Sequence, residues 1–342
     1  NMKNTSMTIR DIAKLANVSV ATVSRVINDS DAVKPETKME VQQVIDLYGF
    51  KPNEVARSLY RKRTKVIGCV LPDITNQYFA RMFLELEKRS FELGYSLFLC
   101  NSINDFKMES FYLNSLVERK VDGIFFLGGR VNETELDMQL LYEVKEIAKE
   151  IPFVIINGKL NLDNVYSIST DDSDAMETIV RYLYDRGHRS IGLLGGIKTV
   201  TVAVDKMNIV KSLILDKYPM DMKKSFCQYS GFGINDGYQA FKNIYEHTEL
   251  PSAIIGINDE VAVGVLKACN ELGIKVPEVL SIFGYDNTVL SEAVYPSLTT
   301  FEHDYQKITE IAVNTINNLI NGEQAQPEIL VKGKIVERDT VK

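Results

Sequence analysis

The sequence contains little of the material from which enzymes, metal sites and membrane anchors are built. Its 342 residues include three histidines and four cysteines, with no C-x-x-C pair, no His-rich metal spacing and no nucleophile elbow. No apolar run approaches the ~20 residues that a membrane-spanning helix needs. These shortages argue against a metal site, a nucleophilic enzyme and a membrane protein.

The cysteines and the first residues indicate a compartment. Cys69, Cys100, Cys227 and Cys269 lie far apart, mostly in apolar or amphipathic runs. Such cysteines are typical of small buried hydrophobic positions in a reducing compartment. The opening stretch NMKNTSMTIR has no apolar core of a secretory signal. We therefore expect a cytoplasmic protein.

Charge is distributed unevenly along the chain. Residues 1–65 carry 12 Lys/Arg and 7 Asp/Glu, a net charge of +5 in a chain whose total is −7, so residues 66–342 carry −12. A basic head joined to an acidic body indicates that only the head meets a polyanion. The length favours two or three domains.

The head has the signals of three short helices. Thr8 is a good N-cap for the first helix, and Ser19 caps the second after the break Asn17-Val18-Ser19. Pro35 stands at the start of a third helix, which Gly49 ends. Two helices joined by a three-residue turn, followed by a third helix, are typical of a helix-turn-helix domain.

From Val66 onward, apolar runs alternate with amphipathic helical patterns. Such an alternation predicts parallel sheets covered by helices on both faces, here two doubly wound lobes. The helical segment 304–321 and the strand-like segment 328–339 must complete one or both lobes. The predicted strands are 66–72, 95–101, 122–129, 152–158, 190–196, 225–230, 252–258 and 279–286, and the predicted helices are 78–93, 105–119, 133–149, 172–186, 203–217, 235–246 and 259–272.

Several motifs resemble the lactose-repressor (LacI/GalR) family of bacterial transcription regulators. In the head they are TIRDIAKLANVSVATVSRVIN, VKPETK and YGFKPNEVARSL. In the body they are IGCVLPDITNQYFA, VDGIFF, DRGHRSIGLLGG, NDEVAVGVLKACNELGIKVPEVLSIFGYDN and PSLTT. The resemblance implies an all-α helix-turn-helix head on an α/β body of two parallel-sheet lobes of the periplasmic-binding-protein type. It also implies a homodimeric repressor that binds operator DNA under the control of a small-molecule effector, a sugar or sugar derivative.

The domain boundaries follow from this organisation. We expect the helix-turn-helix domain at 7–51 and a hinge helix with linker at 52–64. We expect the first lobe to comprise 65–161 with 293–324, and the second lobe to comprise 162–292 with 325–342. No heptad-patterned tail is visible, so we expect a dimer rather than a tetramer.

The stretch VSVATVSRVIN (18–28) is rich in Val, Thr and Ser, which are middling helix formers. A recognition helix must enter the major groove, and small side chains such as Val20 and Ala21 allow close approach to base edges. Thr22 and Ser24 can bond phosphates or bases, and Arg25 can form a fork onto guanine. Val23 and Ile27, in contrast, are expected to face the core of the head.

The resemblance implies further DNA contacts. Leu59 matches the apolar wedge on the hinge helix that opens the minor groove, although it could instead pack on the body. Asn53 matches a residue that supports this hinge. The complete set of expected DNA-binding residues is Thr8, Ser19, Val20, Ala21, Thr22, Ser24, Arg25, Asn28, Asn53, Ala56 and Leu59.

In the body, polar and aromatic residues follow the predicted strands, where a cleft between doubly wound lobes binds its ligand. For Asp286 we favour ligand binding over capping of the loop that follows, whereas Asp259 reads as a helix cap. His303 lies near a lobe crossover and could face the cleft. Where the family carries Arg, this chain has Lys206, which is a point charge and not a fork. The expected effector-binding residues are Asn76, Phe79, Asn157, Lys206, Phe232, Asn258, Asp286 and His303.

Two other classes of protein, a dehydrogenase and a free sugar-binding protein, share some features of this sequence. GFGINDG (231–237), with Asp259 further on, has a spacing like that of a dehydrogenase, but the glycines are not in the first βα unit of either lobe. A free sugar-binding protein of the periplasmic type would lack residues 1–63 and carry a signal peptide. We therefore expect a transcription regulator that is not an enzyme and uses no cofactor or metal.

Overall fold

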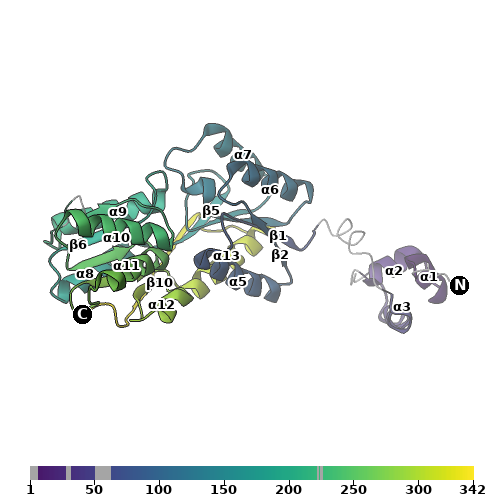
Figure 1. The fold of residues 1–342 in the computed structure, drawn as a ribbon. Coiled ribbons are helices and arrows are strands. Elements are labelled where there is room, and N and C mark those ends of the chain that lie inside the picture. The colour runs from purple at the N-terminus through teal and green to yellow at the C-terminus, as the bar shows by residue number, and fades with distance from the viewer. Residues whose placement is uncertain (1–6, 28–31, 51–62, 222, 224–225) are drawn as a thin grey trace. The chain divides into compact units, whose positions relative to one another are not determined.

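The structure is a computed structural model, and it describes residues 7–27, 32–50, 63–221, 223 and 226–342. The chain forms two compact units, the head (residues 1–65) and the body (residues 66–342). Figure 1 shows the head as a cluster of helices and the body as two sheets flanked by helices. No helix of the described residues is long and apolar enough to cross a membrane.

The head contains the three predicted helices, α1 (Ile9–Leu15), α2 (Val20–Ile27) and α3 (Pro35–Tyr48). Thr8 caps α1 in a capping box, and Gly49 ends α3 in the left-handed conformation at φ 59°. Ser19 Oγ accepts a hydrogen bond from the backbone N–H of Thr22 at 3.0 Å. The core of the head consists of Ile12, Ala13, Val23, Val26, Val41 and Ile45.

The first lobe is built on a parallel sheet with the strand order β11-β5-β4-β3-β1-β2. Helices α5 and α13 pack on one face of this sheet, and α6 and α7 pack on the other. The bounds of its elements are β1 (Val66–Leu71), α5 (Gln77–Glu92), β2 (Ser96–Asn101), α6 (Phe106–Glu118), β3 (Gly123–Leu127), η1 (Gly129–Asn132), α7 (Met138–Ala148), β4 (Phe153–Ile156), β5 (Val165–Thr170), α13 (Tyr305–Ile320) and β11 (Glu328–Val331).

The second lobe is built on a sheet with the order β12-β10-β9-β8-β6-β7, in which only β12 runs antiparallel to its neighbour. Helices α8 and α9 pack on one face, and α10 and α11 on the other. The bounds are α8 (Asp172–Asp185), β6 (Ile191–Leu194), α9 (Thr201–Asp216), β7 (Cys227–Gln228), α10 (Ile234–His247), β8 (Ala253–Gly256), α11 (Asp259–Leu272), β9 (Ser281–Tyr285), α12 (Val289–Ala293), β10 (Thr299–Glu302) and β12 (Lys334–Val336).

The lobe boundaries differ from those predicted. Strand β5 pairs with β4, so 165–170 belong to the first lobe and not to the second. Strand β10 pairs with β9, so 299–302 belong to the second lobe. The predicted strand 328–339 is divided at Gly333 between β11 in the first sheet and β12 in the second. The chain therefore crosses between lobes directly after β5, β10 and β11.

Helix α7 also begins later than predicted, because a short 3-10 helix precedes it. The segment from Gly128 to Gly129 adopts positive φ at both residues and leads into η1. Asp137 then caps α7, and its side chain accepts hydrogen bonds from the first turn. The loop 133–137 between these two elements carries Glu133 and Thr134 toward the second lobe, as described below.

Candidate functional site

The surface of α2 has the composition expected of a recognition helix. Three residues of α2 are exposed to solvent: Val20, with an exposed fraction of 42%, Ala21 and Arg25. Val23 is fully buried, as predicted. Ile27 was expected beside it, but Val26 is the second buried residue and Ile27 only packs against the cluster from outside. The two buried valines hold the helix to the head, so its small exposed side chains and Arg25 remain available.

The remaining predicted polar contacts of the head have capping roles. Thr8 Oγ1 donates to Asp11 Oδ2 at 2.6 Å, and the hydroxyls of Ser19 and Thr22 lie 2.8 Å apart. Ser24 is half-buried on α2. A hollow of about 610 Å³ lies on the head beside α1 and the start of α2. Its lining is Arg10, Ala13, Lys14, Asn17, Val18, Ser19 and Val20.

Asn28, Asn53, Ala56 and Leu59 lie outside the described residues, and so does the predicted hinge helix apart from its last residues. Their expected roles stay predictions.

In the body, Asp286 and His303 form the centre of a buried polar chain. His303 Nε2 lies 2.9 Å from Asp286 Oδ1, and His303 Nδ1 lies 2.5 Å from the hydroxyl of Thr170. Thr170 ends β5 of the first sheet, whereas Asp286 and His303 follow β9 and β10 of the second. The chain of contacts therefore spans the two lobes where the backbone crosses between them.

Burial controls the protonation of this pair. Loss of solvent raises the pKa of Asp286 to about 7, although the charge of Lys206 opposes the shift. Loss of solvent also lowers the pKa of His303 to about 3. His303 is therefore neutral near pH 7 and has one N–H to donate. With Asp286 ionised, the N–H is on Nε2 and Thr170 donates to Nδ1.

Lys206 reaches the same cluster from α9. Its side chain is 5% exposed, and its ammonium lies 3.4 Å from the centroid of the Tyr285 ring. The ammonium is 3.7 Å from Asp172, whose carboxylate accepts a 2.8 Å hydrogen bond from the Tyr285 hydroxyl. A cation held over an aromatic face is stabilised by the ring quadrupole. Lys206 thus lies close enough to Asp286 and His303, two other residues expected to bind the effector, for its charge to act on both.

Aromatic rings surround the polar chain. The His303 ring lies 5.1 Å from Tyr78, 5.1 Å from Tyr285 and 5.4 Å from Tyr305, measured between ring centroids. The hydroxyl of Tyr305 donates to the backbone oxygen of Asp286 at 2.8 Å. The set of expected effector residues omitted Thr170, Asp172, Tyr285 and Tyr305. Tyr285, which ends β9, and Tyr305, which begins α13, can be seen in the sequence, but their contacts with Lys206 and His303 cannot.

Three of the expected effector residues, Asn76, Phe79 and Asn157, lie in the first lobe. Asn157 follows β4 at φ 57°, and its N–H donates to the oxygen of Ile168 on β5. Asn76 is the N-cap of α5 and accepts from the N–H of Tyr78 at 2.9 Å. The ring of Phe79 packs so close to Gly128 that a Cβ there would lie 3.1 Å from it. All three line the carboxyl ends of the first sheet, and Asn76 and Phe79 have structural partners.

In the second lobe, Asn258 and Asp259 organise loops. Asn258 caps α11 by accepting from Val261 N–H, and its amide donates to the oxygen of Phe232 at 2.9 Å. Asp259 is fully buried and accepts hydrogen bonds from the N–H and hydroxyl of Thr288 and from Thr300. The carboxylate of Asp259 therefore fixes the loop that follows Asp286, and the helix cap is Asn258.

Two further contacts join the lobes. Arg81 of α5 donates to the oxygen of Asn287 at 2.9 Å and pairs with Glu302 at 3.0 Å. In the loops before α7 and α9, the N–H of Thr134 donates to the oxygen of Thr199 at 2.8 Å. The lobes are thus joined in two ways: by the side chain of Arg81 near the crossovers, and by a backbone hydrogen bond between the loops that precede α7 and α9.

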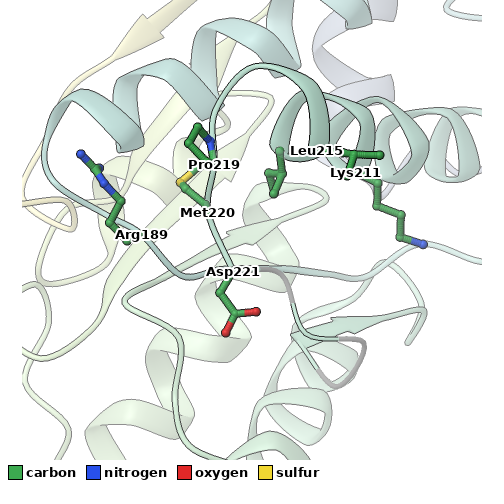
Figure 2. Close-up of a pocket in the computed structure, with 7 residues that line it drawn as sticks. Arg189, Lys211, Leu215, Pro219, Met220 and Asp221 are labelled. Atoms are coloured by element: carbon green, nitrogen blue, oxygen red, sulfur yellow. The ribbon is translucent and has the colours of Figure 1, made fainter.

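A separate hollow of 530 Å³ lies on the second lobe at the amino-terminal end of β6. Figure 2 shows Lys211 and Leu215 on α9, with Arg189, Pro219 and Met220 on the adjoining loops. The carboxyl ends of the strands, which carry Asp286, are at the other end of the sheet. This hollow is therefore distinct from the residues that are expected to bind the effector.

The glycine-rich segment 231–237 has a structural explanation. Asp236 accepts a 2.9 Å hydrogen bond from the N–H of Gly233, the N-cap of α10. A carboxylate therefore occupies the helix end at which a dinucleotide phosphate would bind. Among the described residues, no group of three or more His, Cys, Asp and Glu side chains could hold a metal ion.

Comparison with known proteins agrees with this architecture. Residues 8–53 match bacterial regulatory proteins of the lacI family, and residues 180–341 match a periplasmic binding protein-like domain. Catabolite control protein A of Staphylococcus epidermidis is 31% identical over 338 residues, covering 98% of this chain and 99% of the relative. Its counterpart in Staphylococcus xylosus is 31% identical over 340 residues, covering 98% and 100%.

Solved structures show the same fold. The lac repressor dimer bound to operator and the anti-inducer ONPF has a TM-score of 0.84 at 23% identity, covering 98% of this chain and 99% of that one. A periplasmic binding protein/LacI transcriptional regulator from Alkaliphilus metalliredigens, complexed with D-xylulofuranose, has a TM-score of 0.69 at 26% identity, covering 81% and 99%. With a helix-turn-helix head, two crossed-over lobes and full-length relatives above 30% identity, this chain belongs to the LacI family of DNA-binding bacterial transcription regulators.

Proposed function

We propose that the protein is a repressor that binds a pseudo-palindromic operator as a homodimer and responds to a sugar or sugar derivative in the cleft between its lobes. The observation that carries this proposal is the buried chain Thr170–His303–Asp286, which joins the lobes beside Lys206. A ligand that contacts both lobes there can favour one lobe arrangement over another. Operator binding also places the protein in the cytoplasm and requires no enzymatic activity.

In the DNA-binding step, α2 enters the major groove. Its exposed Val20 and Ala21 approach base edges, and Arg25 donates two hydrogen bonds to guanine. The two heads of a dimer read half-sites about 34–36 Å apart, one helical turn of DNA. Leu59 acts as the wedge at the operator centre, with Asn53 and Ala56 on the same hinge segment.

In the sensing step, the cleft binds hydroxyl groups. A carboxylate such as Asp286 can accept from two hydroxyls, and the Tyr78 ring offers an apolar face to a sugar ring. Solved relatives have been captured with cellobiose and with ribose, at 22% and 24% identity. Because Lys206 replaces the family's Arg, the choice of sugar can differ from theirs.

For dimerisation we propose the edge of the first lobe formed by α5 and β2. Leu84 and Phe91 stand seven residues apart on one face of α5 and are 47% and 79% exposed. On the edge strand β2, Phe98 is 40% exposed. Strands of parallel sheets are usually covered, and an exposed apolar group at a sheet edge is typical of a subunit contact.

The test is selection of random DNA by the purified full-length protein, followed by addition of sugars. We expect enrichment of one symmetric sequence and a change in its affinity with at least one sugar. Enrichment of no symmetric site would contradict operator recognition. A symmetric site whose affinity no sugar changes would contradict the sensing role alone.

A further inference from the structure

A fully buried arginine lies in the first lobe, between α6 and α7. Arg130, the second residue of η1, has the largest side chain that is fully buried in the described part of the chain. An arginine side chain has five N–H groups, and all five of Arg130 are engaged. Their acceptors are the side chains of Glu109 and Ser110 and the oxygen of Phe106 on α6, and the side chain of Glu143 and the oxygen of Leu140 on α7. One side chain therefore ties the segment after β3 to both helices.

The carboxylate of Glu109 is the most enclosed of these acceptors. Glu109 is 1% exposed, lies 2.7 Å from Nε of Arg130, and also accepts from the backbone N–H of Arg130 at 3.3 Å. Gly129 permits this approach, because a Cβ at that position would collide with the Glu109 carboxylate. Burial raises the pKa of Glu109, whereas the hydrogen bonds and the charge of Arg130 lower it. Removal of Arg130 would leave a buried carboxylate without its cation, which is strongly unfavourable.

Helix η1 leads directly into the loop that contacts the second lobe. Glu133 forms an antiparallel backbone bridge with Val200, and the N–H of Thr134 donates to the oxygen of Thr199 at 2.8 Å. Val200 is the N-cap of α9, the helix that carries Lys206. Both contacts are made by backbone atoms, so their geometry depends on what holds each loop in place. On the side of the first lobe, the bonds of Arg130 hold the segment from which the loop starts.

We propose that Arg130 is a positioning residue for this contact between the lobes: its ion pairs with Glu109 and Glu143 fix η1, and η1 places the loop 133–137 against the start of α9. The contact favours the lobe arrangement of this structure over any arrangement in which the two loops part. Arg130 therefore biases the equilibrium through which operator binding is regulated. This last step rests on the proposed function, whereas the positioning of the loop does not.

The experiment measures the contact by cross-linking. Glu133→Cys and Val200→Cys are introduced together into the full-length protein, and we call this variant the cysteine pair. Bridged residues of antiparallel strands have Cα atoms about 4.5–5.5 Å apart, which is within the range of a disulfide. Both positions are half-buried, so oxidised glutathione can reach them. The remaining thiols are counted over time with a maleimide, and the parent sequence with its four cysteines gives the background. Absence of a disulfide in the cysteine pair would contradict the contact itself.

Arg130→Met, added to the cysteine pair, removes the guanidinium from a side chain of similar length. We expect the disulfide to form about tenfold more slowly or slower still, because loss of one partner from a buried ion pair is strongly destabilising. Since this variant leaves Glu109 without its cation, Glu109→Gln with Arg130→Met is measured in parallel. The double variant removes both charges and should show the same slowing.

Leu113→Ala, also added to the cysteine pair, is the matched control. Leu113 is a fully buried residue of α6 that packs among the apolar side chains under α6 and α7. Its truncation destabilises the same lobe and leaves the acceptors of Arg130 in place. We expect a lower melting temperature with disulfide formation close to that of the cysteine pair.

The outcomes separate the two steps of the proposal. Disulfide formation at the unchanged rate in both Arg130 variants overturns the positioning role. Equal slowing in Leu113→Ala, at an equal loss of melting temperature, also overturns it, because general loosening of the lobe then explains the effect. The regulatory step is tested by the operator affinity of the oxidised cysteine pair before and after reduction: a difference supports it, and equal affinity overturns it. Failure to bind any operator overturns the proposed function together with the regulatory step, whereas cross-linking still decides the positioning role.

Discussion

His303 Nε2 lies 2.9 Å from Asp286 Oδ1, and this bond joins residues that follow two neighbouring strands of the second sheet. His303 is 2% exposed, and its other ring nitrogen is held by Thr170 of the first sheet. Both nitrogens are therefore engaged by the protein. We assign His303 a positioning role: it orients the Asp286 carboxylate, and the lobe crossover orients His303.

This assignment predicts the effect of Thr170→Val. The valine keeps the shape of the side chain and removes the hydroxyl that bonds His303 Nδ1, so the ring is less firmly oriented. Affinity for the effector should fall about 3- to 10-fold, while operator affinity without effector stays unchanged. Thr315→Val, at another buried threonine on α13, is the control. Equal sugar affinity in the two variants would remove the positioning role.

Asp286→Ala separates sensing from DNA binding. The variant loses the two charge-assisted hydrogen bonds that the Asp286 carboxylate is proposed to accept from effector hydroxyl groups. Each contributes about 1.5–3 kcal/mol, so effector affinity should fall 100-fold or more. The backbone of Asp286, through Phe301 and Tyr305, retains its own bonds to the lobe. If the effector is an inducer, the variant represses constantly.

The check measures melting temperature, operator affinity and sugar affinity on one preparation. Asp286 adopts φ 102°, which alanine tolerates poorly, so Asp286→Asn is measured in parallel. A variant that melts early and loses DNA binding together with sugar binding would show that Asp286 only stabilises the loop.

The raised pKa of Asp286 predicts a pH dependence of stability. Its folded pKa of about 7 exceeds the ordinary value of 3.8, so between these pH values the folded state holds a proton that the unfolded state releases. The contribution of Asp286 to stability then falls as pH rises through this window and levels off above it. Asp259, with a pKa also raised to about 7, contributes in the same direction. His303, whose pKa burial lowers from 6.5 to about 3, contributes in the opposite direction below pH 6.5, so the net fall depends on the two raised carboxyl groups together. Melting of the sugar-free protein should therefore occur at lower temperature at pH 7 than at pH 5, and Asp286→Asn should reduce the difference. If the melting temperature of Asp286→Asn depends on pH as strongly as that of the parent, Asp286 is not the group whose titration changes the stability.

The proposed subunit contact is tested by Phe91→Glu. Phe91 is 79% exposed, so the substitution places a charge on the α5 face with little effect on the core. We expect a larger monomer fraction in sedimentation velocity, with weaker operator binding at low protein concentration. Tyr142→Glu is the control, because Tyr142 is 61% exposed on α7, which covers the opposite face of the sheet. A parent-like dimer for Phe91→Glu would exclude this edge as the contact.

The sequence predicted the elements that consist of contiguous apolar runs or strong helix caps. Strand β5, with the sequence VYSIST, and strand β10, with the sequence TTFE, were missed because polar residues interrupt their patterns. Those polar residues stand where the chain crosses between lobes. The missed strands therefore account for the wrong lobe boundaries.

The same limit applied to the candidate site. Asp286 and His303 could be proposed because each follows an identifiable motif. The hydrogen bond between them, and the one between His303 and Thr170, depend on which strands lie side by side. Strand pairing joins residues that are far apart in the sequence, so local patterns do not reveal it. The contact of Lys206 with Asp172 likewise joins two helices that are separated along the chain, so local patterns did not reveal it.

The recognition helix makes the sharpest prediction for DNA. Arg25 is exposed on α2, which Val23 and Val26 anchor in the core, so Arg25→Ala should leave the head folded. Loss of a bidentate contact with guanine should weaken operator binding by about 1–3 kcal/mol per half-site and relax the preference at one base position.

Lys62→Ala, in the segment outside the described residues, should instead weaken binding to all DNA sequences alike and flatten the salt dependence of binding, as expected for a phosphate contact. Repeating the DNA selection with both variants decides the matter: if Arg25→Ala enriches the parent site with unchanged preference at every position, Arg25 does not read a base.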